Sequence, residues 1–288
     1  MERLILIETS TALCSAALAE DGVITAYRES SAPKAHASLT AVFIQEMLEE
    51  KGLTIADCDA VCVSKGPGSY TGLRVGVSTA KGLCFGSGKP LIAIGTLDIL
   101  TAQAQEASSE TGIAAPSGTV IADPSETVIA DTSETVIADH SGTLIADPSE
   151  TVIADLIGNP SHIVPMIDAR RMEVYAATFK RTDAPTNHSE ATPRYTQVTE
   201  TAPAIIDETS YTDLLEQGPV LFIGDGAGKC ADVIKHPNAT FIQCWPKASA
   251  MLQPALRAYR ERRFEDVAYF EPFYLKEFVA TVSKKKLF

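Results

Sequence analysis

The segment S-K-G-P-G-S-Y-T-G-L-R, residues 64–74, decides the expected fold of the N-terminal half. It follows a short apolar run that predicts a strand and precedes a helical pattern that extends to about residue 85. Pro67 fixes one φ angle, the glycines permit close backbone approach, and Ser69 or Thr71 can cap the next helix. The segment therefore predicts a tight strand-to-helix turn.

Exposed amides at this helix start could receive a phosphate, which is the alternative to a purely structural turn. The run lacks the G-K-[ST] ending of a P-loop, so ordinary ATPase chemistry is not supported. The candidate nucleotide contacts on this loop are Gly66, Gly68 and Ser69.

Around this segment the pattern predicts three antiparallel strands followed by alternating helices and strands. Asp21-Gly22 is a strong hairpin signal, and Gly52 is placed to end a helix. The predicted strands are 3–8, 14–20, 23–29, 60–64 and 91–94, and the predicted helices are 36–51, 72–85 and 96–107.

The C-terminal half begins near His162 and follows a loosely similar order, which predicts two stacked α/β lobes. Residues 182–202 are polar and are expected to be irregular. The predicted strands are 163–167, 172–180, 220–223 and 240–243, and the predicted helices are 203–216 and 248–263.

Two groups in this half are candidate site residues. Asp168, Arg170 and Glu173 could form an acid–base set, but they fall in a predicted hairpin turn, where local hydrogen bonds and ion pairs are their usual role. Gly224 and Gly226 follow a predicted strand in a G-x-G-x-G run, which alone is a weak nucleotide signal; a plain turn is the preferred interpretation.

Residues 116–155 are five tandem octads: PSGTVIAD, PSETVIAD, TSETVIAD, HSGTLIAD and PSETVIAD. Their eight acids account for most of the net charge of −13, because the other 29 acidic residues face 24 basic ones, a net of −5. The even period would place equivalent side chains on one face of regular strands, so a small meander is one interpretation. The preferred one is an expanded surface loop without function, since such loops tolerate length at small free-energy cost; a partner-binding role is the third.

The charge and composition limit the function. An acidic chain is poorly suited to a direct nonspecific grip on nucleic acid, which needs clustered Lys and Arg. The six cysteines form no C-x-x-C pair and lie mostly in apolar runs, which indicates buried reduced thiols. No stretch approaches 18 apolar residues, and residues 1–8 are interpreted as a core strand and not as a signal peptide. We therefore expect a cytoplasmic protein without a membrane association.

The run Gly66-Pro67-Gly68-Ser69-Tyr70-Thr71-Gly72-x-Arg74 resembles the G-P-G-S-[FY]-T-G-x-R motif of the bacterial TsaB (YeaZ) family. Other segments resemble the same family: ILIETS at 5–10, with Glu8 where the family has Asp, and the runs 82–100, 165–179 and 271–277. The resemblance covers nearly all of 1–107 and 162–288 but leaves out the octads.

The resemblance implies an actin-like (ASKHA) α/β architecture of two RNase H-like lobes. The implied domains are an N-terminal lobe at 1–107, a low-complexity insertion at 108–161 and a C-terminal lobe at 162–288. It leaves open whether the last helix packs back on the N-terminal lobe.

The resemblance also implies a function: a non-catalytic scaffold subunit of the complex that puts threonylcarbamoyl on adenosine 37 of tRNAs reading codons that begin with A. The implied partners are a TsaD-like catalytic subunit and a TsaE-like ATPase, with tRNA contacted only through the complex. A homodimer, and an ATP or ADP contact at the face shared with the catalytic subunit, remain open; no other cofactor is implied.

In this family the helices that match 36–50 and 72–85 pair with the catalytic subunit and also self-associate. The second is rich in small residues, which allow close helix approach; the alternative is that both helices pack only within their own lobe. The implied interface residues are His36, Leu39, Phe43, Tyr70, Thr71, Gly72, Arg74, Val75 and Val77.

The TsaD family binds a metal through an H-x-x-x-H pair on the helix that matches GTLDILTAQA at 95–104, which contains no histidine here. Metal-assisted transfer needs such ligands, so the chain is not expected to be an enzyme on its own and no metal is expected. The alternative is an independent nucleotide-binding enzyme of the actin-like ATPase group, which would bind and turn over ATP. A glycopeptidase is remote because no nucleophile–base constellation is evident.

Overall fold

The computed structural model describes residues 1–107, 143–145, 160–182 and 194–275. The proposed octad meander, the alternative expanded loop and most of the insertion at 108–161 lie outside the described residues. The described part is a mixed α/β fold with a five-stranded and an eight-stranded sheet.

The N-terminal sheet has the strand order β3-β2-β1-β4-β5. The first three strands are antiparallel neighbours, whereas β4 and β5 run parallel to β1. Its elements in chain order are β1 (Arg3–Glu8), β2 (Cys14–Glu20), β3 (Val23–Ser30), α1 (Ala35–Glu50), the 3-10 turn η1 (Ile55–Asp57), β4 (Ala60–Gly66), α2 (Tyr70–Ser87), β5 (Leu91–Gly95) and α3 (Thr96–Ala107).

The C-terminal sheet follows a similar plan, with antiparallel strands on one side of β7 and parallel strands on the other. Its order is β10-β9-β7-β12-β13-β6, and β8 pairs with both β7 and β11. The strands are β6 (Thr143–Ile145), β7 (His162–Asp168), β8 (Glu173–Ala176), β9 (Phe179–Thr182), β10 (Arg194–Gln197), β11 (Ala202–Ile205), β12 (Val220–Ile223) and β13 (Ala239–Gln243). The helical segments are α5 (Thr212–Leu215), α6 (Ala227–Ala231), η2 (Ser249–Met251) and α7 (Leu252–Arg260).

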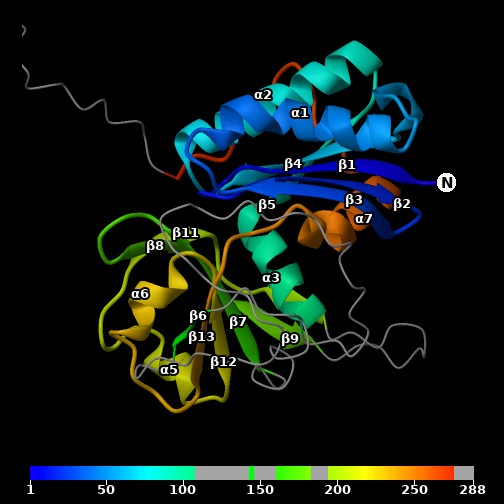
Figure 1. Ribbon diagram of the computed structural model, residues 1–288. Helices are drawn as coiled ribbons and strands as arrows, with labels where there is room; N and C mark the ends of the chain where they lie inside the picture. Colours follow the sequence, from blue (N-terminus) through cyan, green and yellow to red (C-terminus); the bar gives the residue numbers. More distant parts are fainter. Residues whose placement is uncertain (108–142, 146–159, 183–193, 276–288) are drawn as a thin grey trace, which may run out of the picture.

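Each sheet buries both faces, as the alternation of its side chains requires. In the N-terminal sheet, Ile5 and Ile7 pack toward α1 and α2, whereas Leu4 and Leu6 pack toward α7. In the C-terminal sheet, one face packs against α5 and α6 and the other against α3. Figure 1 shows α3 and α7 between the two sheets, with α1 and α2 on the outer face of the N-terminal sheet.

Most N-terminal elements match the sequence prediction to within two residues. The end of α1 forms a Schellman motif, in which the Gly52 N–H donates to the Glu49 carbonyl (3.0 Å) and the Leu53 N–H to the Leu48 carbonyl (2.8 Å). Gly52 has a φ of 64°, so the predicted glycine stop is confirmed. Helix α2, however, begins at Tyr70 and not at residue 72, because the Ser69 side chain caps it by accepting the Gly72 N–H (3.3 Å).

The predicted strand 172–180 is wrong as one element, since it is divided into β8 and β9. Both pair with β7 in one register, but the pairing stops opposite Val164 and Pro165. Proline has no N–H to donate to the ladder. Thr178, at the break, instead bonds residues 198 and 199 through its backbone.

The predicted helix 203–216 is also wrong, as is the irregular structure expected just before it. Residues 194–197 form β10, Ala202–Ile205 pairs with β8 as β11, and only Thr212–Leu215 is helical. The Asp207 carboxylate accepts the Thr209 N–H (2.9 Å) and the hydroxyls of Thr209 and Ser210. Such local side-chain hydrogen bonds compete with helix formation, so the helix begins late.

The predicted helix 248–263 starts as the 3-10 turn η2 and continues as α7 to Arg260. Leu252 and Leu256 are buried and Tyr259 packs against the same cluster, as its amphipathic pattern predicts. This cluster also holds Leu4 and Leu6 of β1, so α7 contacts the N-terminal sheet.

Two glycines of α2 give a matched pair of substitutions. A Cβ at Gly72 would lie 2.1 Å from the Thr9 carbonyl oxygen, whereas a Cβ at Gly82 meets no atom within 4 Å. We expect Gly72→Ala to lower the free energy of unfolding by about 2–3 kcal/mol through overpacking. Gly82→Ala should raise it by about 0.5–1 kcal/mol through helix propensity. Urea denaturation of both variants checks this, and equal stabilities would contradict the tight contact at Gly72.

Candidate functional site

The G-P-G-S-Y-T-G segment packs against the turn that follows β1. The Ser69 N–H donates to the Ser10 carbonyl (2.6 Å). A Cβ at Gly68 would lie 2.3 Å from that same oxygen, and one at Gly72 would lie 2.1 Å from the Thr9 carbonyl. These glycines are thus needed because the backbones of two loops approach too closely for any side chain.

The other side of the loop contacts the C-terminal part of the chain. The Phe273 N–H donates to the Lys65 carbonyl (2.7 Å), and a Cβ at Gly66, whose φ is 107°, would lie 2.7 Å from the Phe273 oxygen. The Lys81 Nζ donates to the carbonyls of Ala268 (3.1 Å) and Phe270 (3.0 Å). Residues 66–72 and 271–275 therefore meet in space, a contact that sequence spacing alone could not reveal.

This packing explains the loop glycines without a ligand. Gly66 and Gly68 contact backbone of their own chain, and the Ser69 and Gly72 amides are hydrogen-bonded within it. The helix start thus presents fewer open amides than a phosphate cradle would need. The nucleotide contact predicted for Gly66, Gly68 and Ser69 stays a prediction, and this geometry gives it no separate support.

The predicted interface residues divide by burial. Phe43 (8% exposed) and Val77 (4%) lie in the core beneath α1 and α2, and Gly72 is buried against Thr9. Phe43 and Val77 thus pack inside their own lobe, and the predicted contact of these three residues with a partner stays a prediction that their burial does not support. The other six remain on the surface or at its edge: Thr71 and Arg74 are exposed, and His36, Leu39, Tyr70 and Val75 are half-buried.

We call the exposed outer side of these two helices the α1–α2 surface. It contains a shallow hollow of roughly 460 Å³ lined by Ala37, Tyr70, Thr71, Arg74, Val75, Ser78 and Thr79. Four of the nine predicted interface residues line this hollow, and they come from one face of α2 beside α1.

An aromatic and cationic group lies at one end of the α1–α2 surface. The rings of Tyr70 and Tyr274 have centroids 4.9 Å apart. The Arg74 guanidinium lies 5.3 Å from the Tyr70 ring centroid and donates to its hydroxyl (3.0 Å). Tyr and Arg are the residue types enriched where protein interfaces bind most strongly. Sequence analysis missed Tyr274, although it lies in the segment 271–277 that carried part of the resemblance.

Exposed apolar side chains add to the same two helices. Phe85, near the end of α2, is 88% exposed, and Val42 of α1 is also exposed. Single exposed apolar residues are common in monomers, but several on neighbouring helices are typical of a docking surface.

A buried polar cluster lies beneath this surface, at the carboxyl ends of the parallel strands β1, β4 and β5. Glu8 is fully buried, and its Oε1 accepts the Ser10 N–H (2.6 Å). Burial raises the pKa of the Glu8 carboxyl to about 7, although the hydrogen bond from the Ser10 N–H acts in the opposite direction. The carboxyl ends of parallel strands are where α/β sheets bind ligands, so this cluster is the second candidate site.

Several polar atoms in the cluster have no hydrogen-bond partner among the described residues. They are Glu8 Oε2 and the hydroxyl oxygens of Thr9, Ser10, Thr11 and Thr96. Such groups are costly in a protein interior unless water or a proton bridge satisfies them. A protonated Glu8 has an O–H to donate to a neighbouring hydroxyl, which fits its raised pKa.

Glu8→Gln tests this cluster through the pH dependence of stability. With a pKa near 7 in the folded chain and an ordinary value of 4.5, Glu8 contributes stability that is complete below pH 4.5 and is lost as the pH rises through 7. From pH 4 to pH 8, the free energy of unfolding of the non-titrating variant should therefore rise relative to that of the wild type by up to about 3 kcal/mol. Denaturation at several pH values measures this difference.

Glu208→Gln, at an exposed position, controls for the loss of one negative charge. If the stability difference between wild type and Glu8→Gln is the same at pH 4 and pH 8, Glu8 is not a buried neutral acid.

The group Asp168, Arg170 and Glu173 forms the turn between β7 and β8. The Asp168 carboxylate accepts the Arg170 N–H (3.0 Å) and pairs with Lys229 of α6. The Lys229 Nζ also donates to the carbonyls of Arg171 and Glu173, each at 2.7 Å. The lysine therefore holds the turn in place, which supports the structural interpretation. No sequence pattern pointed to Lys229, because it lies 61 residues from Asp168.

The Gly224–Gly228 turn is held in the same way by its own chain. A Cβ at Gly224 would lie 2.2 Å from the Met166 carbonyl oxygen. The Gln243 side chain accepts the Gly228 N–H (2.7 Å) and donates to the Asp225 carbonyl (3.0 Å). Burial raises the pKa of Asp225 to about 6. These contacts support a plain turn, and the nucleotide contact at Gly224 and Gly226 stays a prediction.

Other candidate chemistry can be stated only for the described residues. Among them, no group of three or more His, Cys, Asp or Glu side chains could hold a metal ion. The six cysteines are free, and all but Cys244 are buried. No helix in the described ranges is long and apolar enough to cross a membrane.

Comparison with known proteins agrees with this fold. The family model described as "TsaD: tRNA N6-adenosine threonylcarbamoyltransferase" matches residues 28–124. The tRNA threonylcarbamoyladenosine biosynthesis protein TsaB of Escherichia coli K12 is 34% identical over 113 residues, 39% of this chain and 48% of that protein. TsaB of Haemophilus influenzae is 41% identical over 104 residues, 36% of this chain and 42% of that protein.

The structural comparison covers more of the chain. YeaZ from Pseudomonas aeruginosa superposes with a TM-score of 0.66 at 21% identity, over 96% of this chain and 100% of that one. A crystal structure described as an uncharacterized protein with similarity to peptidase YEAZ, also from P. aeruginosa, gives a TM-score of 0.67 at the same identity and coverage. At this identity the likeness shows the fold.

Together these comparisons define a relative of the threonylcarbamoyladenosine biosynthesis proteins. The chain is similar in sequence to TsaB proteins over part of their length, and similar in fold to YeaZ. In sequence it spans about half the length of the curated relatives it matches.

Proposed function

We propose that this chain is a non-catalytic scaffold subunit in the formation of N6-threonylcarbamoyladenosine at position 37 of tRNAs that read codons beginning with A. The α1–α2 surface is the observation that carries the proposal. It combines the Tyr70–Arg74–Tyr274 group, a shallow hollow and exposed apolar residues on two adjacent helices. A flat surface of this kind fits another protein better than a small substrate.

The occupant of the α1–α2 surface would be a TsaD-like catalytic subunit. A tRNA N6-adenosine threonylcarbamoyltransferase of Maricaulis maris is 42% identical over 67 residues, 23% of this chain and 18% of that protein, which supports a partner that resembles this chain over one segment. The heterodimer would then bind a TsaE-like ATPase, and a homodimer through the same helices would compete with it. ATP or ADP would lie at the face shared by the two subunits.

The non-catalytic assignment is supported by helix α3. In the TsaD family the matching helix carries the metal-binding histidines, whereas 95–104 has none. Its Leu97, Ile99 and Leu100 are buried between the two sheets. The helix therefore has a packing role, and transfer from threonylcarbamoyl-adenylate would take place on the partner.

We also propose the actin-like architecture of two RNase H-like lobes. The order β3-β2-β1-β4-β5 and the corresponding order β10-β9-β7-β12-β13 support it, because each has antiparallel strands on one side and parallel strands on the other. The net charge of −13 further supports a tRNA that is held by the partners and not by this chain.

Arg74→Glu tests the interface. Because Arg74 is exposed, the fold should be retained in this variant. The reversed charge removes the hydrogen bond and the cation–π contact with Tyr70. We expect affinity for the TsaD-like subunit to fall at least about tenfold, as for a central interface arginine, and tRNA modification to fall with it. Titration of the purified subunits by calorimetry measures the change.

Lys180→Glu, an exposed charge reversal on β9 of the other sheet, is the matched control and should bind like the wild type. Equal affinities for the two variants would place the partner elsewhere.

Reconstitution of tRNA modification tests the scaffold role itself. The reaction should need this subunit and should continue when residues 116–155 are deleted, since the octads are foreign to the resemblance. Modification at the full rate without this chain would overturn the scaffold proposal. Loss of activity in a folded deletion variant would show that the octads take part.

A further inference from the structure

The turn after β1 supports the first two turns of α2. A Cβ at Gly72 would lie 2.1 Å from the Thr9 carbonyl oxygen, and a Cβ at Gly76 would lie 2.2 Å from the Thr9 hydroxyl oxygen. The Ser69 N–H donates to the Ser10 carbonyl (2.6 Å). Glycine at both helix positions lets the turn lie directly against the helix backbone, so a displaced turn removes the support of the start of α2.

The same turn also supports the start of α1. His36 is the second residue of that helix, and its Nε2 donates to the Thr11 carbonyl (2.8 Å). The two helices that form the α1–α2 surface therefore share one short support, residues 9–11, which lies at the beginning of each.

Glu8 lies directly before this support and inside the protein. It is 0% exposed, and its Oε1 accepts the Ser10 N–H (2.6 Å). Among the described residues its Oε2 has no hydrogen-bond partner, and neither do the hydroxyl oxygens of Thr9, Ser10 and Thr11. A protonated carboxyl can donate to such an oxygen, whereas a carboxylate can only accept. The closed turn is therefore better suited to a neutral Glu8 than to an ionised one.

A charge on Glu8 would also lack a counter-charge. The elements packed around it carry acidic and basic side chains, but within the described part of the chain none of these forms an ion pair with Glu8. An unpaired buried carboxylate is costly. The charged or titratable side chains that these elements contribute around Glu8 are Cys14 of β2, His36 of α1, Lys65 at the end of β4, Asp98 of α3 and Lys247 before η2, whereas α2 meets the turn at the uncharged Gly72 and Gly76.

We propose that residues 8–11 are a proton-controlled support for the α1–α2 surface: a neutral Glu8 keeps the turn closed against both helices, and ionisation of Glu8 favours an open turn. Opening brings the carboxyl to water and breaks the hydrogen bonds of the turn with Ser69 and His36. A partner that binds the closed form would by linkage bind less strongly as the pH rises. This inference does not depend on the proposed scaffold role.

The size of the effect follows from the pKa of Glu8 in the two forms. Burial raises this pKa to about 7 in the closed form, and an exposed carboxyl returns to the ordinary value of 4.5. Closure is therefore favoured fully below pH 4.5, and the advantage is lost as the pH rises through 7. By this linkage the equilibrium constant for opening rises about tenfold between pH 6 and pH 8.

Amide hydrogen exchange of the full chain, followed residue by residue by NMR, tests the proposal. Protection is expressed relative to the intrinsic exchange rate at each pH. In the wild type, protection of the Ser69 amide should fall about tenfold from pH 6 to pH 8. In Glu8→Gln, whose side chain stays neutral, it should change less than about twofold.

Two results would overturn the proposal. A tenfold fall that persists in Glu8→Gln would show that the pH acts through another group, such as His36. An equal fall for the amides of β4, in the middle of the sheet, would show that the pH acts on the whole lobe and not on the turn.

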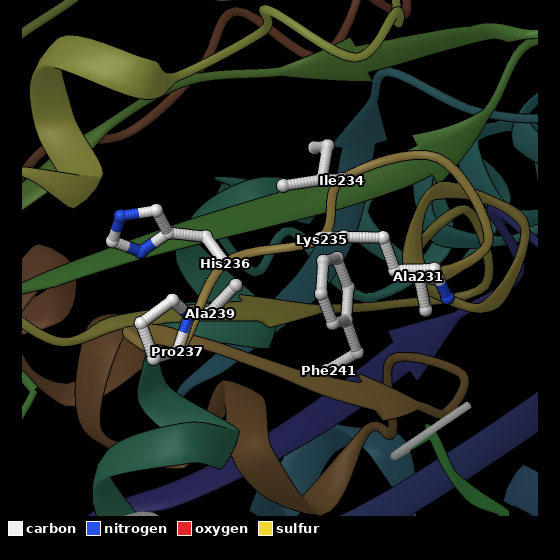
Figure 2. A pocket seen from close by; sticks show the side chains of 7 residues that line it. All are labelled: Ala231, Ile234, Lys235, His236, Pro237, Ala239 and Phe241. Carbon is white, nitrogen blue, oxygen red and sulfur yellow. The ribbon is translucent and has the colours of Figure 1, made fainter. Parts of the chain in front are cut away.

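His236→Gln is the matched control. His236 lines a hollow of about 270 Å³ beside β13 of the other sheet, and Figure 2 shows its imidazole among the lining side chains. Imidazole is the side-chain group that ordinarily changes charge near neutral pH. The control should keep the tenfold fall at Ser69, and its loss in this variant would contradict a local effect of Glu8.

Titration of the wild type provides a test that does not require the Glu8→Gln variant to fold. The ¹³C shift of the Glu8 carboxyl should change with a midpoint near pH 7, and the amide shifts of Ser69 and Ser10 should follow the same midpoint. A Glu8 midpoint below pH 5, or turn amides that do not follow Glu8, would overturn the proposal.

Discussion

The contact between the turn after β1 and the start of α2 is the constraint on which the rest of the N-terminal lobe depends. The Ser69 N–H bonds the Ser10 carbonyl, and Gly68 and Gly72 bring the two backbones closer than any side chain would allow. This contact fixes where α2 begins, and therefore which of its residues face the core and which face outward. Gly72 and Gly76 of α2 lie against Thr9 and so set the rotation of the helix about its axis. In this orientation Val77 faces the core and Arg74 faces the surface.

The same contact produces the buried polar cluster. Glu8 ends β1 directly before the turn, so closing the turn over α2 removes its carboxyl from water. Burial favours the protonated form, which can still satisfy hydroxyl neighbours as a donor. A carboxyl that is costly to ionise is thus a consequence of the packing that places the α1–α2 surface. The close contact between the turn after β1 and the start of α2 thus produces both the α1–α2 surface and the buried polar cluster.

The sequence predicted what local chemistry controls. Asp21-Gly22, Gly52 and Ser69 marked a hairpin, a helix end and a cap because their own backbone preferences decide those points. The prediction was wrong where contacts between residues far apart in the sequence determine the secondary structure. Pro165 of β7 interrupts the pairing of the strand that was predicted at 172–180. Residues 203–205, which were expected to be helical, pair with β8 as part of β11. The predicted interface residues all lie on α1 and α2, but the buried Phe43 and Val77 could be distinguished from the exposed Arg74 only once the packing was known.

The location of the polar cluster is consistent with the proposed scaffold role. Carboxyl ends of parallel strands commonly form a ligand crevice, but here the chain fills that position itself. The Thr9–Ser10 turn occupies one side of the loop, and the Phe273 backbone occupies the other. Because this position is filled, the outer helices present the exposed aromatic and cationic groups. Binding a protein partner there needs no movement of the cluster beneath, whereas admitting a nucleotide to the crevice would require the loop and the C-terminal segment to separate.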